Sequence, residues 1–439
     1  MKLADIIDTF ISGDWGEESP TQDTPNAAYC VRGADIVPIT NHNFTDIPQR
    51  YVCDRTKETK LLAAGDLVIE KSGGSPTQST GRIVYVSEDL IKVKGNVVCS
   101  NFCTAFRVKA GWNPLYVYYF WQNVYNHGAF FNFEGKTSGI KNLQLDNALS
   151  AIDIEYLPLE KQNQIVASLA SIDEKIKVNR KINDNLEAMA KQLYDYWFVQ
   201  FDFPNEEGKP YKSNGGVMVW NEDLHMSIPC TWNTCLLSDY IGSNNTGDWG
   251  FDEPAKKRSI KVGCIRGADI VKLNDLPIRY IKDNNTSKLL SAWDIVIEVS
   301  GGSPTQATGR SAFVTPGVLK RNGGNLTCSN FCHAFTMKDY KASAYFYFMW
   351  RMFYDNNNMF NFEGKTSGIK NFMTDTFLAN KWLDVPTALL DLFFERVKVI
   401  YEQIDNNIEE INALTKQRDE LLPLLMNGQA TVNYHLSAC

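Results

Sequence analysis

The triplet Gly-Lys-Thr is the pattern in this chain that most suggests nucleotide chemistry. It stands at residues 135–137 and again at 364–366. A phosphate-binding P-loop needs another glycine five residues earlier, so that backbone N–H groups can surround the phosphates. Phe130 and Met359 occupy those positions, which argues against nucleotide binding in both places. The chain has five histidines and no catalytic motif in a suitable context, so we expect no catalytic residues and no metal site.

A second set of polar residues occurs twice and suits contact with DNA. "SGGSPTQSTGR" from Ser72 matches "SGGSPTQATGR" from Ser300 at all but one position. A Gly-Gly-Ser-Pro run predicts a turn, but a turn alone does not explain the repeated Thr, Gln and Arg. Glutamine can bond adenine in the major groove, and arginine can bond guanine or a phosphate. The predicted DNA contacts are Ser75, Thr77, Gln78 and Arg82, with Ser303, Thr305, Gln306 and Arg310 in the second segment.

The segment "KTSGIKN" also occurs twice, and its hydroxyls and lysines suit DNA phosphates. A solvated loop explains its composition equally well. The candidate phosphate contacts are Lys136, Thr137, Ser138 and Lys141, with Lys365, Thr366, Ser367 and Lys370.

Two further repeated motifs leave alternatives open. Arg32 and Arg266, in "RGADI", could contact DNA or pair with the aspartate three residues later. In "GDWG" we expect Trp15 and Trp249 to pack within a turn rather than stack on bases.

These motifs recur because nearly the whole chain is written twice. "GDWG" from Gly13 returns from Gly247, and "NFEGKTSGIKN" from Asn132 returns from Asn361, so one domain of about 160 residues is copied in tandem. Apolar runs from Asp66, Arg82 and Asp294 predict strands, and aromatic runs at residues 112–126 and 342–356 predict core helices. Two equivalent heads suit a target that itself has two related parts.

Each copy is followed by a long pattern with apolar residues at alternating spacings of four and three, the heptad of a coiled coil. Pro158 and Pro386 stand just before the two patterns, where proline suits a helix start. Asparagines, Asn183 among them, interrupt both patterns, and a buried Asn fixes register and partner choice. We expect an antiparallel pair with one head at each end of a rod; the alternative is a local two-helix bundle that supports each domain. The predicted seam is Ile165, Leu169, Ile172, Ile176, Asn179, Leu186 and Leu193, with Val397, Ile400, Ile404, Asn407, Ile411, Leu414 and Leu421.

The net charge of −7 is unusual for a protein that binds DNA alone, because phosphate neutralisation supplies most of the affinity. Residues 1–157 carry 14 basic against 18 acidic side chains, and residues 220–385 carry 18 against 16. A DNA reader of this kind should depend on partners for cationic surface. No membrane span or secretory signal is visible, so we expect a cytoplasmic protein whose ten cysteines are reduced. The six cysteines that recur in both copies are expected to be buried in apolar surroundings.

The chain resembles the specificity subunits of type I restriction–modification enzymes over nearly its full length. Residues 135–169 are similar to that family's exit from a target recognition domain into its first conserved helix. Residues 193–224 are similar to the family's central region, and "LLPLLMNGQ" from Leu421 is similar to its end.

The resemblance implies an α+β fold, with two tandem-repeated mixed α/β target recognition domains joined by two long antiparallel coiled-coil helices. The expected domains are residues 1–157 (first recognition domain), 158–204 (first spacer helix and central region), 205–385 (second recognition domain with its connecting segment) and 386–439 (second spacer helix and tail). It further implies a non-catalytic reader of double-stranded DNA that binds two modification subunits and restriction/translocase subunits. No cofactor is expected on this chain; S-adenosylmethionine, ATP and Mg would bind to those partners. Our hypothesis is that the modification subunit binds the rod and the aromatic stretch at residues 196–204, including Trp197 and Phe201.

Similar heads related by a pseudo-twofold axis would meet opposite DNA strands. We therefore predict a nearly palindromic bipartite target, with an adenine to be methylated in each half. The copies diverge most at residues 38–60 against 272–288 and at 83–98 against 311–327, where any asymmetry between half-sites should map. The main alternative is a twin-headed coiled-coil scaffold that grips a symmetric protein.

Overall fold

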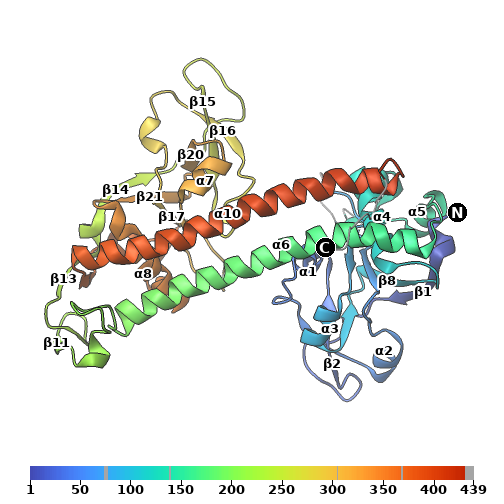
Figure 1. Cartoon of the computed structure of the whole chain (residues 1–439), viewed down its shortest axis with the longest axis horizontal. Coiled ribbons are helices and arrows are strands. Elements are labelled where there is room, and N and C mark those ends of the chain that lie inside the picture. Colours follow the sequence, from blue (N-terminus) through green and yellow to red (C-terminus); the bar gives the residue numbers. More distant parts are fainter. Residues whose placement is uncertain (74–77, 138–139, 304, 367–368, 431–439) are drawn as a thin grey trace, which may run out of the picture. The chain divides into compact units, whose positions relative to one another are not determined.

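The computed structural model describes residues 1–73, 78–137, 140–303, 305–366 and 369–430 (Figure 1). The chain divides into two compact units, Met1–Val178 with Ile411–Cys439 and Asn179–Glu410. Both divisions fall inside long helices, so each unit contains part of each helix. The domain boundaries given above, at residues 157, 204 and 385, stay predictions.

Each unit contains the same three sheets in the same strand order, which confirms the duplication seen in the sequence. An antiparallel sheet has the order β1-β8-β4-β6 in the first unit and β14-β21-β17-β19 in the second. A sheet with one parallel pair follows the order β3-β2-β7 or β16-β15-β20, and a small sheet follows β5-β10-β9 or β18-β23-β22. The strands of the first unit are β1 (Ile7–Ser12), β2 (Asn26–Val31), β3 (Gln49–Val52), β4 (Leu67–Glu70), β5 (Ser72–Gly73), β6 (Ile83–Tyr85), β7 (Val97–Cys99), β8 (Cys103–Val108), β9 (Glu134–Thr137) and β10 (Ile140–Leu143). Those of the second are β14 (Ile241–Thr246), β15 (Ile260–Ile265), β16 (Ile278–Ile281), β17 (Ile295–Glu298), β18 (Ser300–Gly301), β19 (Ser311–Phe313), β20 (Leu326–Cys328), β21 (Cys332–Met337), β22 (Glu363–Thr366) and β23 (Ile369–Phe372).

The aromatic runs form the core helices that the sequence predicts. They are α4 (Pro114–Asn126) and α8 (Ser343–Asp355), and Trp121 and Trp350 on them are fully buried. The predicted strands are also confirmed, as β4, β6 and β17. The shorter helices are α1 (Ile36–Thr40), α2 (Asp54–Thr59), α3 (Glu88–Lys94) and α5 (Leu145–Ala151), with α7 (Pro316–Arg321) and α9 (Thr374–Leu378) in the second unit.

Two long helices follow the recognition segments, directly after Pro158 and Pro386. They are α6 (Leu159–Tyr194, 36 residues) and α10 (Thr387–Met426, 40 residues). In the second unit the Asn407 amide donates to Asn183 at 2.7 Å and Asn179 donates to Glu410 at 2.9 Å. Residue numbers rise on one helix as they fall on the other, so the pair is antiparallel. The predicted seam residues are buried or half-buried, while the placement of one head at each end of a rod stays a prediction. In the described part of the chain, no helix is long and apolar enough to cross a membrane.

The aromatic stretch after α6 belongs to the core of the second unit, so the hypothesis that Trp197 and Phe201 contact a partner protein is wrong. A π-helical turn, Asp195–Val199, turns the chain inward here. Trp197 and Phe201 are 4% and 2% exposed, and their rings pack on Phe393 and Trp232. Two pairs of strands complete this region: β11 (Met218–Asn221) with β12 (Met226–Pro229), and β13 (Asn233–Leu236) with β24 (Lys381–Asp384).

The repeated cysteines are buried, as their apolar surroundings in the sequence predict. Burial raises the pKa of the Cys99 thiol to about 12 and that of Cys103 to about 11. Their twins Cys328 and Cys332 are equally buried. A thiol with a raised pKa is a weak nucleophile, so these residues fill space in the core.

Candidate nucleic-acid interface

The predicted DNA-contacting segments of each copy gather around one buried glutamate. Glu70 ends β4 and is 3% exposed. Arg82 donates to it twice, from Nε to Oε2 at 2.8 Å and from Nη2 to Oε1 at 2.6 Å. Glu298 and Arg310 repeat this pair at the end of β17 with the same two distances. The hydrogen-bonded carboxylate raises the pKa of either arginine, so both guanidinium groups stay charged. These bonds hold the segment before β6 against β4 and the segment before β19 against β17. Contact of Arg82 and Arg310 with DNA stays a prediction.

The backbone of the neighbouring loop approaches this glutamate too closely for a side chain. Gly73 and Gly301 have φ of +144° and +146°, and a Cβ on either would lie 2.7 Å from the glutamate Oε1. A Cβ on Gly33 would also collide with Glu70. The glycines of the repeated motifs are therefore required by packing, and they bring the RGAD turn and the SGG run to the same carboxylate.

A second ion pair ties each recognition loop to the KTSGIKN hairpin. Lys141 on β10 lies 3.0 Å from Glu134 on β9, and Glu134 also accepts from the Thr80 amide at 2.7 Å. Lys370, Glu363 and Thr308 repeat these contacts at 2.9 and 2.7 Å. Both lysine side chains are mostly buried and pair with a glutamate of their own hairpin. Binding of DNA phosphates by Lys141 and Lys370 stays a prediction.

These two glutamates should make the hairpins sensitive to acid. Burial alone would raise the pKa of Glu134 and Glu363, but the threonine amides and lysines lower it below its usual value of about 4.3. Stability from a carboxyl with a lowered pKa is present above the unfolded value and is lost as pH falls through the folded value. We expect Glu134→Gln to lower the urea midpoint at pH 7 and to have a shrinking effect below about pH 4.3. An effect of constant size down to pH 3 would contradict this assignment.

The aromatic helices fix the base of each recognition loop from beneath. The Trp121 indole N–H donates to the Gly81 carbonyl at 2.7 Å, and Trp350 donates to Gly309 at 2.7 Å. The Tyr125 hydroxyl donates to the Ser79 carbonyl at 3.0 Å. Residues 79–82 therefore form a rigid base in the first copy, directly after the predicted base-reading residue Gln78.

Gln78 and Gln306 are exposed, as readers of DNA must be. Ser303 and Thr305 lie in a turn in which the Gln306 amide donates to the Ser303 carbonyl at 3.2 Å. The other predicted contacts of these loops, Ser75, Thr77, Ser138 and Ser367, lie outside the described residues.

The Gly-Lys-Thr triplets lie in strands β9 and β22, an extended backbone unlike a P-loop. This agrees with the prediction from the missing glycines. The strand backbone is described at Lys136, Thr137, Lys365 and Thr366, and their contact with phosphates stays a prediction.

The two motifs with open alternatives are resolved toward internal contacts. Arg32 pairs with Asp35 at 2.9 and 2.8 Å, and Arg266 pairs with Asp269 at 2.7 and 2.8 Å. Both arginines keep over a third of their side-chain surface exposed, so DNA contact stays a prediction.

Both tryptophans of GDWG pack within the domain, as the sequence predicts. The Arg50 guanidinium lies 4.2 Å from the centre of the Trp15 ring, and Arg279 lies 4.3 Å from that of Trp249.

The sequence prediction missed an exposed phenylalanine that occurs in both copies. Phe102 is 59% exposed and Phe331 is 56% exposed. The Phe102 carbonyl accepts from the amides of Lys71 and Ser72, and Phe331 makes the same two bonds in the second copy, so each turn is fixed beside its recognition loop. The repeated "CSNFC" run, from Cys99 and from Cys328, was the available signal. We define the recognition edge as Arg32, Ser72, Gln78, Phe102 and Lys141 in the first copy, and Arg266, Ser300, Gln306, Phe331 and Lys370 in the second.

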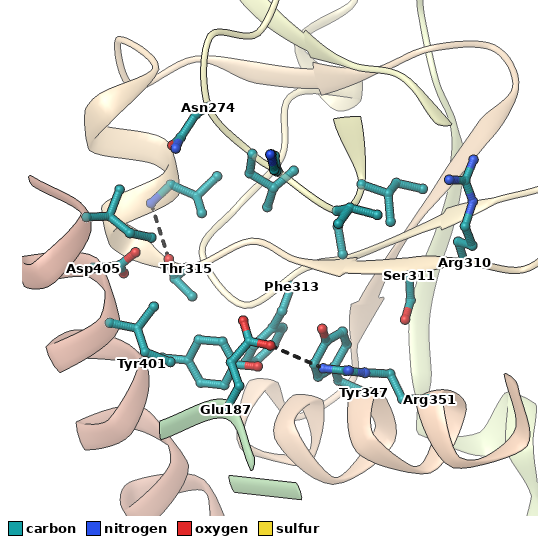
Figure 2. Close-up of a pocket in the computed structure, with 18 of the residues that line it drawn as sticks. Glu187, Asn274, Arg310, Ser311, Phe313, Thr315, Tyr347, Arg351, Tyr401 and Asp405 are labelled. Atoms are coloured by element: carbon teal, nitrogen blue, oxygen red, sulfur yellow. Dashed lines mark hydrogen bonds and ion pairs between the residues drawn. The ribbon is translucent and has the colours of Figure 1, made fainter. Parts of the chain in front are cut away.

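A cavity of about 470 Å³ lies in the second unit beside α8 and α10 (Figure 2). Arg310, Arg321 and Arg351 contribute to its wall. Each has a carboxylate partner, in Glu298, Asp405 and Glu187 respectively. The charges of these three arginines are thus paired within the unit, which favours a structural role over anion binding.

Residues 18–188 match the family model of the type I restriction modification DNA specificity domain. The first copy and most of α6 are thus similar to that DNA specificity domain. The matched range contains the whole recognition edge of the first copy, and the second unit repeats the strand orders of the first in three sheets.

Two relatives of the chain are specificity subunits of type I restriction enzymes. The chain is 27% identical over 298 residues to the Type I restriction enzyme MjaIX specificity subunit of Methanocaldococcus jannaschii, an alignment covering 65% of this chain and 62% of that protein's length. It is 20% identical over 323 residues to the Type I restriction enzyme HindI specificity subunit of Haemophilus influenzae, with 64% and 70% covered. The type I restriction-modification S subunit from M. genitalium aligns with a TM-score of 0.47 at 14% identity, covering 97% of this chain and 95% of that one.

Proposed function

We propose that this chain is the DNA sequence-specificity subunit of a type I restriction–modification complex. Each copy reads one half of a bipartite, near-palindromic target, and partner subunits carry out adenine methylation and restriction. The chain itself is not catalytic. The observation that carries the proposal is the recognition edge, which is built twice from equivalent residues in a chain whose residues 18–188 match a DNA specificity domain.

The complex we propose contains double-stranded DNA, two modification subunits and restriction/translocase subunits, and acts in the cytoplasm. S-adenosylmethionine, ATP and Mg bind to the partner subunits. The net charge of −7 is consistent with this assembly, because the partners can supply the cationic surface around the DNA. The assembled complex should retain duplex DNA with a steep dependence on salt; salt-independent assembly without DNA would favour the protein scaffold instead.

Substitution of the two glutamines tests which copy reads which half-site. We expect Gln78→Ala to relax recognition of one half-site and Gln306→Ala to relax the other, each by about 1–3 kcal/mol, because a bidentate bond to adenine is lost. The measurement is the affinity of the assembled complex for duplexes with single base changes in either half. Equal weakening on all sequences would instead assign both residues to phosphates.

The exposed phenylalanines should contribute apolar contact with DNA. We expect Phe102→Ala and Phe331→Ala each to weaken binding to target DNA by about 1–2 kcal/mol, the scale of burying an exposed apolar ring. The melting temperature should stay unchanged, because the rings are exposed in the free chain. Phe10 is a matched control, since it is 50% exposed but has Asn244 at the equivalent place. If Phe10→Ala and Phe102→Ala weakened DNA binding equally, Phe102 and Phe331 would have no specific role in DNA contact.

A further inference from the structure

The two recognition domains are held on their long helices by ion pairs of opposite polarity. In the first unit the acid is on the short helix: Asp89 on α3 accepts from Lys177 on α6 at 2.9 Å. In the second unit the acid is on the long helix. Asp405 on α10 accepts from Arg321 on α7 at 2.7 Å and from the Gly317 amide at 3.1 Å.

The residues involved occupy equivalent positions in the two copies. Ser87 and Thr315 cap the short helices by accepting from the amide three residues later, at 3.1 and 3.2 Å. Asp89 and Gly317 each follow their cap by two residues. Lys177 and Asp405 stand equally far beyond Pro158 and Pro386. The long helices therefore carry opposite charges at equivalent positions, and the short-helix partner shifts from two residues after the cap (Asp89) to six residues after it (Arg321).

The two contacts also differ in how closely the short helix approaches the long helix. A Cβ on Gly317 would collide with the Asp405 carboxylate, so α7 can approach α10 this closely only with glycine there. Figure 2 shows Asp405 on α10 close to Thr315, the cap of α7. α3 carries an aspartate, Asp89, at the position of Gly317. An aspartate at position 317 would clash sterically with Asp405 and would also repel its negative charge.

One helical turn away, a polar contact is exchanged for an aromatic one. The Tyr119 hydroxyl donates to Asp173 on α6 at 2.6 Å. Phe348 and Tyr401 occupy the equivalent places in the second copy, with ring centres 6.5 Å apart. Phe348 could not donate to Asp173, so the second domain lacks a group that the first long helix uses.

We propose that these exchanged contacts are a pairing code that assigns each recognition domain to its own long helix. On α6 the second domain would place Arg321 against Lys177. On α10 the first domain would place Asp89 against Asp405. The two domains share their fold, but each would pack stably only on its own long helix. This inference does not rest on the proposed function.

Transplanting the code within the full-length chain tests it. Asp89→Gly with Val93→Arg gives α3 the residues of α7, because Val93 is the equivalent of Arg321. We expect this variant to melt about 3–6 °C below the control, and Lys177→Asp added to it to restore the melting temperature to within about 1 °C. The control is Glu88→Gly with Val93→Arg, which carries the same glycine cost and the same arginine but keeps Asp89. Hydrogen exchange in α3 and α6 should locate the loss and the recovery.

The addition of Lys177→Asp decides the question. Failure to restore the transplanted variant, or equal recovery when Lys177→Asp is added to the control, would show that the ion pairs are incidental and that either domain could sit on either helix. Recovery confined to the transplanted variant supports the code.

Discussion

Glu298→Ala should destabilise the second unit by about 3 kcal/mol, because it leaves the mostly buried Arg310 guanidinium without its carboxylate. For a unit of this size such a loss lowers the melting temperature by roughly 6–12 °C. The loop from Ser300 should also lose its position, since Gly301 and Arg310 both lie against Glu298. Recognition by the second copy should fail while recognition by the first copy persists.

Calorimetry of the full chain measures the stability effect, and half-site binding by the assembled complex measures the functional one. Glu420→Ala is the matched control, because the Lys416–Glu420 pair is exposed on both sides and should contribute little. Glu298→Gln should fall between, since an amide keeps an acceptor for Arg310 but loses the charge. Normal stability of Glu298→Ala, with binding lost, would mean that Arg310 is a DNA reader and that Glu298 is an incidental neighbour.

Trp197→Ala should have an effect of similar or greater size. The ring is 4% exposed and packs against Phe198 and Phe393, so its removal leaves a large cavity in the core of the second unit, just after α6 ends. A change of this kind costs about 3–5 kcal/mol. We therefore expect poor folding of the second unit, with any loss of partner binding following from it.

Tyr196→Ala is the comparison that separates a core residue from a contact residue. Tyr196 is 38% exposed on the same turn, so its replacement should leave the melting temperature nearly unchanged. If Trp197→Ala kept its stability and lost only co-purification with a modification subunit, the assignment of Trp197 to the core would be contradicted.

The long-range architecture was predictable because it rests on periodic patterns. The heptads and the prolines before them predicted α6 and α10 within a residue at their starts, and Asn407 meets Asn183 in the antiparallel pair. The duplication predicted two equivalent folds, since equal sequence imposes equal strand order. Helix starts and the duplication can be predicted because they depend on local sequence patterns or on repeated sequence.

The internal partners of the polar residues were less predictable. Arg82 follows Glu70 by a loop, and only the return of β6 alongside β4 brings the two together. The Glu134–Thr80 bond joins segments far apart in sequence. Sequence alone therefore identified which polar residues recur, but it could not distinguish those that hold the loops, such as Arg82, from those that face outward, such as Gln78.

Trp197 shows a related limit. An aromatic run after a helix suits either a core or an interface, because both bury apolar rings. The choice depends on α8 and α10, whose aromatic residues enclose it.

Sequencing of modified adenine in DNA from cells that express this chain with its modification subunit tests the central claim most directly. We predict a bipartite motif of two similar words in inverted orientation, with one methylated adenine in each half on opposite strands, that disappears when this chain is deleted. Two unrelated half-sites would contradict the near-palindrome. Methylation unchanged by deletion of the chain would contradict its role as the reader.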